Sequence, residues 1–300
     1  MLLELKRVSK EFQNVKAVDE VSFTVPHGRI LGLLGPNGAG KTSLIRIITG
    51  ITRADSGQVL MDGKDLTDIT DPSIGYMPEE RGLYKKMKVG EQLVYLCRLK
   101  GSSAQDALQK VNYWMEKFEI QNWWNKKVDE LSKGMSQKIQ FIATIAHNPK
   151  LIILDEPFSG LDPINSNLIK DEIKNLKDQG ASILFSTHRM EQVEEMCEEI
   201  VLINKGKIIL GGAVQEIRER FKEDKYELMT SSEIPNELSI PADTISRNEH
   251  QTILKLHAGA SSNDVLNALI RSNIQIKSFR EILPSFNEIF IRSVNEVNHE

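Results

Sequence analysis

The sequence predicts an α/β fold built around a parallel sheet, followed by a smaller α+β domain. Continuous apolar runs at residues 30–34, 151–154 and 182–186 are typical of strands that are buried on both faces of a parallel sheet. Segments with helical spacing follow these runs, most clearly at 163–179. After residue 221, short β segments replace this alternation, which indicates a second folding unit.

The chain begins with two segments, 2–9 and 15–25, that alternate apolar and polar side chains as half-buried strands do. Phe12 lies between these two ranges, in the early β region of the chain. An aromatic ring there could stack on a nucleotide base, because stacking needs only a flat π-face. It could equally be an ordinary buried phenylalanine, and its spacing leaves both interpretations open.

A glycine-rich loop follows the run at 30–34 and leads directly into a helix. Strand, loop and helix in this order form the context of a phosphate-binding loop. Glycines let backbone N–H groups converge on phosphate oxygens, and the helix N-terminus adds partial positive charge. Lys41 can reach the β- and γ-phosphates, and the Thr42 hydroxyl can ligate Mg²⁺. The expected phosphate site comprises Gly35, Pro36, Asn37, Gly38, Ala39, Gly40, Lys41, Thr42 and Ser43.

The middle of the chain predicts a short strand at 74–77 and then helices from 90 to about 121. Ser102 or Ser103 can cap a helix that runs through Phe118. Residues at helical spacing give its expected apolar face: Leu108, Val111, Met115 and Phe118. A further helix with apolar periodicity is expected at 136–147, and the Asn148-Pro149 pair that follows should end it.

Two acids, Asp155 and Glu156, stand at the carboxyl end of the strand at 151–154. Ligand chemistry gathers at that edge of an open α/β sheet. Asp155 would hold Mg²⁺, and Glu156 would orient or deprotonate an attacking water. Solvated acids at a strand end are the alternative, which the phosphate loop in the same chain makes the weaker one.

The remaining core segments are a strand at 182–186 that ends in Thr187-His188 and a hairpin formed by 200–204 and 207–210. A charged linker at 222–225 then leads into the last part of the chain. It holds three or four short β segments, a helix near 263–272 and another after Pro284. We find no chemical motif there.

Composition narrows the class of protein. The chain has 300 residues, 40% hydrophobic and 27% charged, as a soluble globular protein does. Its net charge of −4 offers no basic field, so nucleic acid is not an expected partner. The two cysteines, Cys97 and Cys197, fit a reducing compartment. No apolar run approaches the ~18 residues that span a bilayer, so another chain would supply any membrane-spanning part.

These motifs together resemble the ATP-binding subunit of an ABC transporter over residues 1 to about 220. Residues 35–42 match Walker A, and 151–156 match Walker B with Glu156 in the catalytic position. Residues 131–135 resemble the family signature LSGGQ, and 159–162, with Asp162, match the D-loop. His188 matches the switch histidine, and Phe12 the base-stacking aromatic.

The resemblance implies an ABC-type ATP-binding domain at 1–221, with an antiparallel β subdomain and a helical insertion at about 90–130. A small accessory domain occupies 226–300. It also implies head-to-tail pairing with a second ATPase subunit, an identical copy or a paralogue, with ATP and Mg²⁺ between them. Signature residues then contact ATP across the interface: Ser132, Lys133, Gly134 and Met135. A membrane-spanning permease subunit would hold the pair at the cytoplasmic face of the cell membrane.

Two departures from the family pattern affect this site. Lys133 and Met135 replace the Gly and Gln of the signature, and the added Lys could pair with phosphate or face solvent. Glu79 replaces the usual Q-loop Gln, which contacts Mg²⁺ and signals to the membrane subunit. A Glu keeps an oxygen ligand but adds negative charge, or it turns away and leaves Glu80 or Arg81 to signal.

The sequences of residues 76–84 and 283–290 are similar to those of export-type subunits close to the sodium-extruding NatA group. Sodium is one candidate cargo, and drugs, peptides or lipids are others. A soluble ABC-type ATPase of translation or DNA repair is the rival class. Its members usually carry a second cassette, a long coiled coil or cysteine zinc sites, and this sequence shows none of these features. A P-loop GTPase is a second rival, but Lys207 stands where its base-reading motif needs Asp.

Overall fold

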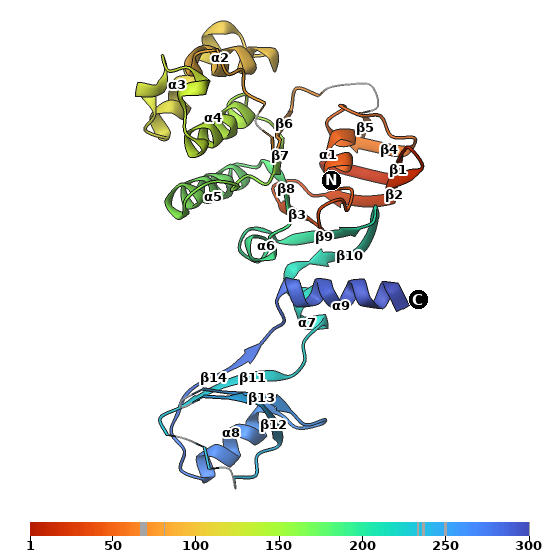
Figure 1. Cartoon of the computed structure of the whole chain (residues 1–300), viewed down its shortest axis with the longest axis vertical. Coiled ribbons are helices and arrows are strands. Elements are labelled where there is room, and N and C mark those ends of the chain that lie inside the picture. The colour runs from red at the N-terminus through yellow and green to blue at the C-terminus, as the bar shows by residue number, and fades with distance from the viewer. Residues whose placement is uncertain (67–70, 81, 233, 236–237, 249–250, 300) are drawn as a thin grey trace. The chain divides into compact units, whose positions relative to one another are not determined.

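The computed structural model describes the whole chain except residues 67–70, 81, 233, 236–237, 249–250 and 300 (Figure 1). The chain divides into two compact units: residues 1–214 with 293–300, and residues 215–292. Each unit is described by itself.

A six-stranded sheet in the order β10-β9-β3-β8-β7-β6 forms the centre of the first unit. The pairs from β9 to β6 are parallel, and only β10 pairs antiparallel to its neighbour. All residues of β3, β7 and β8 are buried, which confirms the predicted α/β fold with a parallel sheet. The strands are β3 (Ile30–Leu34), β6 (Ile74–Met77), β7 (Leu151–Asp155), β8 (Ser182–Thr187), β9 (Glu199–Asn204) and β10 (Lys207–Ala213).

An antiparallel sheet in the order β2-β1-β4-β5 forms the subdomain expected near the N-terminus. Its inner face packs with α1 (Lys41–Ile48) and the central sheet around one hydrophobic core, in which Leu44 and Ile45 are fully buried. The shared core fixes the glycine-rich loop between the two sheets. The strands are β1 (Leu3–Phe12), β2 (Val15–Val25), β4 (Ser56–Met61) and β5 (Lys64–Asp65).

The helical insertion corresponds to α2 (Val89–Leu99) and α3 (Ala104–Lys117), the 3-10 turns η1 (Gln121–Trp123) and η2 (Val128–Glu130), and then α4 (Lys133–Ile145). Ser103, rather than Ser102, caps α3 by accepting a hydrogen bond from the Asp106 N–H. The predicted apolar face of α3 is wrong at Leu108, which is 43% exposed, because the helix turns Ala107 and Trp114 inward instead. Trp124 packs against Gly90, where a Cβ would lie 2.3 Å from the indole ring.

Two more helices follow strands of the central sheet: α5 (Pro163–Asp178) after β7 and α6 (Met190–Met196) after β8. Helix α5 connects the neighbouring parallel strands β7 and β8, and α6 connects β8 to β9, which lies on the other side of β3. Because these strands are parallel, the carboxyl ends of β3, β7 and β8 meet at one edge, where the candidate site lies. Among the described residues, no helix has both the length and the apolar character needed to cross a membrane.

The second unit is an antiparallel sheet in the order β12-β13-β11-β14, with α8 packed on one face (Figure 1). Leu228 and Leu254 on the strands and Val265 and Leu269 on the helix form its own hydrophobic core. This is an α+β arrangement, as predicted. Its elements are β11 (Lys225–Thr230), β12 (Ala242–Arg247), β13 (Gln251–Leu256), α8 (Ser262–Arg271) and β14 (Ile276–Ile282). The helix α7 (Val214–Arg220) precedes it, and α9 (Phe286–His299) ends the chain.

Candidate nucleotide-binding site

A cavity of about 310 Å³ opens at the carboxyl edge of the central sheet. It collects residues from the glycine-rich loop, from the ends of β7 and β8, and from the segment after β6. Most of the predicted phosphate and catalytic residues therefore meet in one place. The lining comprises Ala17, Asn37, Gly38, Ala39, Gly40, Lys41, Thr42, Ser43, Glu79, Asp155, Glu156 and His188.

Two glycines of the loop are required by the backbone. Gly40 precedes α1 with φ of 109°, and a Cβ there would lie 2.2 Å from the Ala17 carbonyl oxygen. Gly35 has φ of 152°, and a Cβ there would lie 2.2 Å from the Ile203 carbonyl oxygen. A side chain at either position would push the loop off β2 or β9, so this cradle depends on glycine.

Lys41 is held inside the loop and is only 8% exposed. Its Nζ donates to the carbonyl oxygens of Gly35 at 2.7 Å and Pro36 at 3.1 Å. Gly35 and Pro36 thus anchor the lysine rather than line the cavity. Burial lowers the pKa of Lys41, while the nearby carboxylates of Glu156, Asp155 and Glu79 oppose that shift. The site therefore presents one ammonium group among several acids, and a bound phosphate would be drawn to it.

Asp155, the last residue of β7, is 3% exposed. Burial raises its pKa, and the neighbouring carboxylates Glu79 and Glu156 add to the shift. A buried acid beside other acids favours a cation in the same cavity. The donor set fits Mg²⁺, because the Thr42 hydroxyl and the Asp155 and Glu79 carboxylates are oxygen donors. Within the described ranges no cluster of three His, Cys, Asp or Glu could hold a metal by itself, so phosphate oxygens would complete the coordination.

Glu156 directly follows the carboxyl end of β7, and residues at the end of β8 hold it in place. Its backbone has φ of 50°, and its N–H donates to the Ser186 carbonyl oxygen at 2.9 Å. Thr187 Oγ1 donates to Oε2 at 3.1 Å, and the His188 N–H donates to Oε1 at 2.7 Å. The carboxylate is 7% exposed and lines the cavity, as a group that orients water would. The sequence pattern did not point to a role for Thr187, although its position next to His188 at the end of a strand indicated that it lies near the site.

Phe12 lies outside the cavity. It ends β1 and is 46% exposed, so the alternative of a buried phenylalanine is wrong. Phe12 pairs with Val15 across the β1–β2 turn, and Ala17, two residues further along β2, lines the cavity. The Lys10 ammonium lies 5.4 Å from the centre of the Phe12 ring. The ring is thus open to stacking at the end of a hairpin that reaches the cavity.

The signature residues lie at the N-terminus of α4 and do not line this cavity. The expected helix start at 136 is wrong by one turn: α4 begins at Lys133, because Ser132 Oγ accepts a hydrogen bond from the Met135 N–H at 3.2 Å. Ser132 and Lys133 are exposed, and Gly134 and Met135 are half-buried. These four residues therefore form an open helix start that a ligand of another chain can reach.

Asp162 caps the next helix, α5. Its carboxylate accepts hydrogen bonds from the backbone N–H of Asn165 at 2.9 Å and from the Asn165 side-chain amide. These bonds hold the pKa of Asp162 below its usual range. The carboxylate stays exposed and outside the cavity, so within this chain its role is to start α5.

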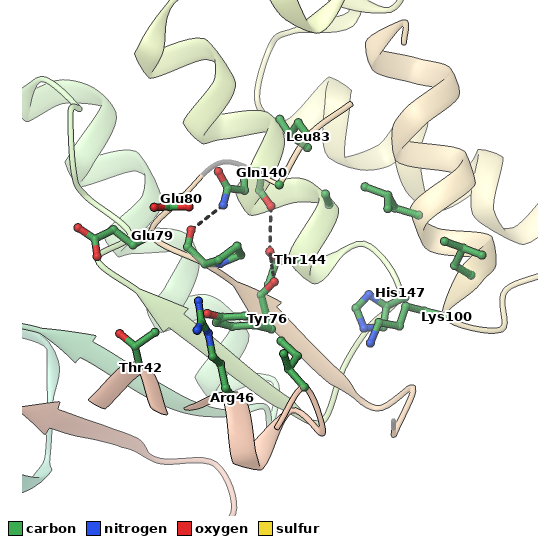
Figure 2. Close-up of a pocket in the computed structure, with 16 residues that line it drawn as sticks. Thr42, Arg46, Tyr76, Glu79, Glu80, Leu83, Lys100, Gln140, Thr144 and His147 are labelled. Carbon is green, nitrogen blue, oxygen red and sulfur yellow. Dashed lines mark hydrogen bonds between the residues drawn. The ribbon is translucent and has the colours of Figure 1, made fainter. Parts of the chain in front are cut away.

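A larger groove of about 690 Å³ lies beside the cavity, and Figure 2 shows its lining. Thr42 and Glu79 line both hollows. The opposite wall comes from α2 and from Gln140 and Thr144 of α4. Gln140 Nε2 donates to the Pro78 carbonyl at 2.7 Å, next to Glu79. The sequence pattern does not reveal this groove, because residues from four distant segments form it.

Glu80 also lines this groove, whereas Arg81, the other candidate for signalling, lies outside the described residues.

Comparison with known proteins agrees with this geometry. A family model described as ABC transporter matches residues 18–159. A second, described as ATP-binding protein DrrA1-3-like, C-terminal domain, matches residues 212–294. The uncharacterized ABC transporter ATP-binding protein YhaQ of Bacillus subtilis is 41% identical over 99% of both chains. The ABC transporter ATP-binding protein NatA of Bacillus subtilis is 33% identical over 79% of this chain and all of its own.

A solved structure of the ATP-binding subunit of an ABC transporter matches the fold with a TM-score of 0.69 and 29% identity. The match covers 74% of this chain and 93% of the other. On these grounds the chain belongs to the family of ABC transporter ATP-binding subunits.

Proposed function

We propose that this chain hydrolyses ATP to power an exporter in a membrane. The convergence of Lys41, Asp155 and Glu156 on one cavity carries the proposal, because phosphoryl transfer needs a cation, an oxygen ligand for metal and a carboxylate that orients water. The domain at 1–221 performs this chemistry. The accessory domain at 226–300 modulates or stabilises the pair.

The cavity residues divide the work among them. Backbone N–H groups of the glycine-rich loop and the Lys41 ammonium bind the phosphates. The oxygens of Thr42, Asp155 and Glu79 would hold Mg²⁺, which when bound neutralises charge on the transferred phosphoryl group. Glu156 orients the attacking water and accepts its proton, while His188 binds the γ-phosphate or that water.

A second ATPase subunit completes the site. The exposed helix start formed by Ser132, Lys133, Gly134 and Met135 suits the γ-phosphate of ATP held by the partner, because a helix N-terminus attracts anions. Closure around two ATP molecules, and reopening after hydrolysis, would then drive transport. Phe12 stacks on the adenine base of the ATP bound in this chain's own cavity, since its ring is exposed at the end of the hairpin that reaches the cavity.

A membrane-spanning permease subunit would dock in the groove of Figure 2, which places this chain at the cytoplasmic face of the cell membrane. Glu79 lies on the wall shared by the groove and the phosphate cavity, so binding on one side affects the other. The resemblance of residues 76–84 and 283–290 to export-type subunits supports export, with sodium or a drug as candidate cargo. The matched relatives do not favour a role in translation or DNA repair, because their names are those of transporter subunits.

Reconstitution tests the proposal. The chain is combined with the membrane protein that co-purifies with it in vesicles loaded with Mg²⁺-ATP and candidate cargo. We expect vectorial cargo movement that stops when Glu156 is replaced by Gln. Co-purification with ribosomes or DNA in place of a membrane protein would contradict it.

A further inference from the structure

A buried hydrogen bond joins the helix that carries the signature turn to the backbone beside the catalytic carboxylate. Gln137 Nε2 donates to the Pro157 carbonyl oxygen at 2.8 Å. Gln137 lies in the second turn of α4 and is 3% exposed, and Pro157 directly follows Glu156. Because the bond is shielded from water, its loss would leave a buried carbonyl without its donor.

The same two segments also lie close together one turn earlier in α4. A Cβ placed on Gly134, in the first turn of α4, would lie 3.7 Å from Cδ2 of Leu161. The intervening chain is folded back on itself, since the Ser159 N–H donates to the Glu156 carbonyl at 3.1 Å and the Leu161 N–H to that of Phe158 at 3.3 Å. Residues 157–161 therefore form a folded segment after Glu156, and the Gln137 bond ties this segment to α4.

The backbone of Glu156 needs such support. Its φ of 50° lies in the left-handed region, which is unfavourable for a residue that has a Cβ. The bond from its N–H to Ser186 holds one side of this residue, and the bond from Gln137 holds the Pro157 carbonyl, one peptide further along the chain. Without the bond from Gln137, the peptide between Pro157 and Phe158 loses this anchor, and we expect the backbone of Glu156 and its carboxylate to shift with it.

We propose that Gln137 is a positioning residue for Glu156. It fixes the catalytic carboxylate of one subunit to the helix start that contacts the nucleotide of the other. Docking of Ser132 and Gly134 on the partner's ATP is then transmitted through α4 and Gln137 to the subunit's own Glu156. This inference rests on the proposed function, and it adds a connection between the two ATP sites.

The test replaces Gln137 by Met, which keeps the length of the side chain but cannot donate a hydrogen bond. We expect kcat of the full chain for Mg²⁺-ATP to fall about tenfold, as small misplacements of a catalytic group do. Binding of Mg²⁺-ATP should stay within about twofold, because Lys41 and the loop are untouched. Gln137→Glu is the second variant, since an ionised carboxylate also lacks the donor, and it should fall at least as far.

Ser182→Ala is the matched control. Ser182 Oγ makes a comparable buried bond to the Pro26 carbonyl at 2.9 Å, at the opposite end of β8 from the cavity. We expect its melting temperature to fall while kcat stays at the wild-type value. An equal loss of kcat in Ser182→Ala would reduce the effect of Gln137 to general stability and overturn the proposal.

The double variant decides whether Gln137 acts through Glu156. Adding Gln137→Met to Glu156→Gln should lower single-turnover hydrolysis by less than about twofold more. A further tenfold loss, or wild-type kcat in both Gln137 variants, would refute the positioning role while leaving the proposed function intact. Wild-type hydrolysis in Glu156→Gln alone would show instead that the proposed function has misplaced the catalytic carboxylate.

Discussion

The backbone N–H and Nδ1 of His188 both meet one oxygen of Glu156, Oε1, at 2.7 and 2.6 Å. Thr187 donates to the other oxygen, so both carboxylate oxygens are held by the end of β8. With Nδ1 engaged by Glu156, Nε2 is the ring nitrogen that can meet a phosphate oxygen or water in the cavity. Contacts within the single chain thus hold the carboxylate in one orientation.

Replacing Lys41 with Ala should abolish ATP hydrolysis and weaken ATP binding at least about tenfold. The substitution removes the ammonium that opposes three nearby carboxylates, so the phosphates would meet uncompensated negative charge. Titration with a fluorescent ATP analogue and a phosphate-release assay measure both effects. Wild-type turnover in the purified variant would refute the role of the glycine-rich loop.

Sequence patterns predicted the parts of the site whose chemistry is local. The glycine-rich loop, the buried strands and the acids Asp155 and Glu156 occupy neighbouring positions in the chain, so their spacing carries the signal. Strand position then followed from the rule that ligands gather at the carboxyl edge of a parallel sheet.

Contacts between distant segments could not be predicted in the same way. Gln137 and Gln140 look like ordinary polar helix residues, yet each binds a proline carbonyl across the fold. The first turn of α4 lacks apolar periodicity, so the cap at Ser132 was missed. Leu108 was expected inside because leucine suggests a core face, but α3 buries Ala107 and Trp114 and leaves Leu108 exposed.

Changing Glu79 to Gln should keep ATP affinity within about tenfold, or ~1.4 kcal/mol. Glu79 lines the edges of both the cavity and the groove, and an amide oxygen keeps the ligand atom while removing one charge. The larger change should appear in the stimulation of ATPase activity by the membrane subunit. Complete loss of nucleotide binding in isothermal titration would mean that the charge of Glu79 is essential.

Removing residues 226–300 should leave a folded protein that binds Mg²⁺-ATP. Among the described residues, the core around α1 and the core around α8 share no member, so each segment has its own hydrophobic interior. Circular dichroism melting and an ATP titration of the truncated chain test this. A truncated protein that melts cooperatively but binds no nucleotide would refute the independence of the two domains.

Acid should destabilise the fold through His147. Burial lowers the pKa of His147 from 6.5 to about 4, helped by the nearby Lys100 (Figure 2). The unfolded chain therefore takes up this proton before the folded chain does, and stability falls as pH drops from 6.5 to 4. Urea unfolding at several pH values gives the free energy of unfolding as a function of pH. Between pH 6.5 and 4 this free energy should change less steeply with pH in His147→Asn than in wild type. Equal slopes would exclude His147 as a source of the acid sensitivity.

Glu156→Gln tests whether Glu156 is the catalytic carboxylate. The amide keeps the size of the side chain but cannot accept a proton, so hydrolysis should fall by ~10²–10⁴ while ATP binding survives or tightens. Glu172→Gln is the control, since Glu172 is also buried but pairs with Lys117 on α3, outside the cavity.

Single-turnover γ-phosphate release is the measurement, made on the purified chain and on its complex with the membrane subunit. The account predicts that Glu156→Gln retains Mg²⁺-ATP and accumulates as a closed pair, whereas Glu172→Gln hydrolyses at the wild-type rate. Undiminished phosphate release from Glu156→Gln in both settings would contradict the assignment of Glu156 as the catalytic carboxylate.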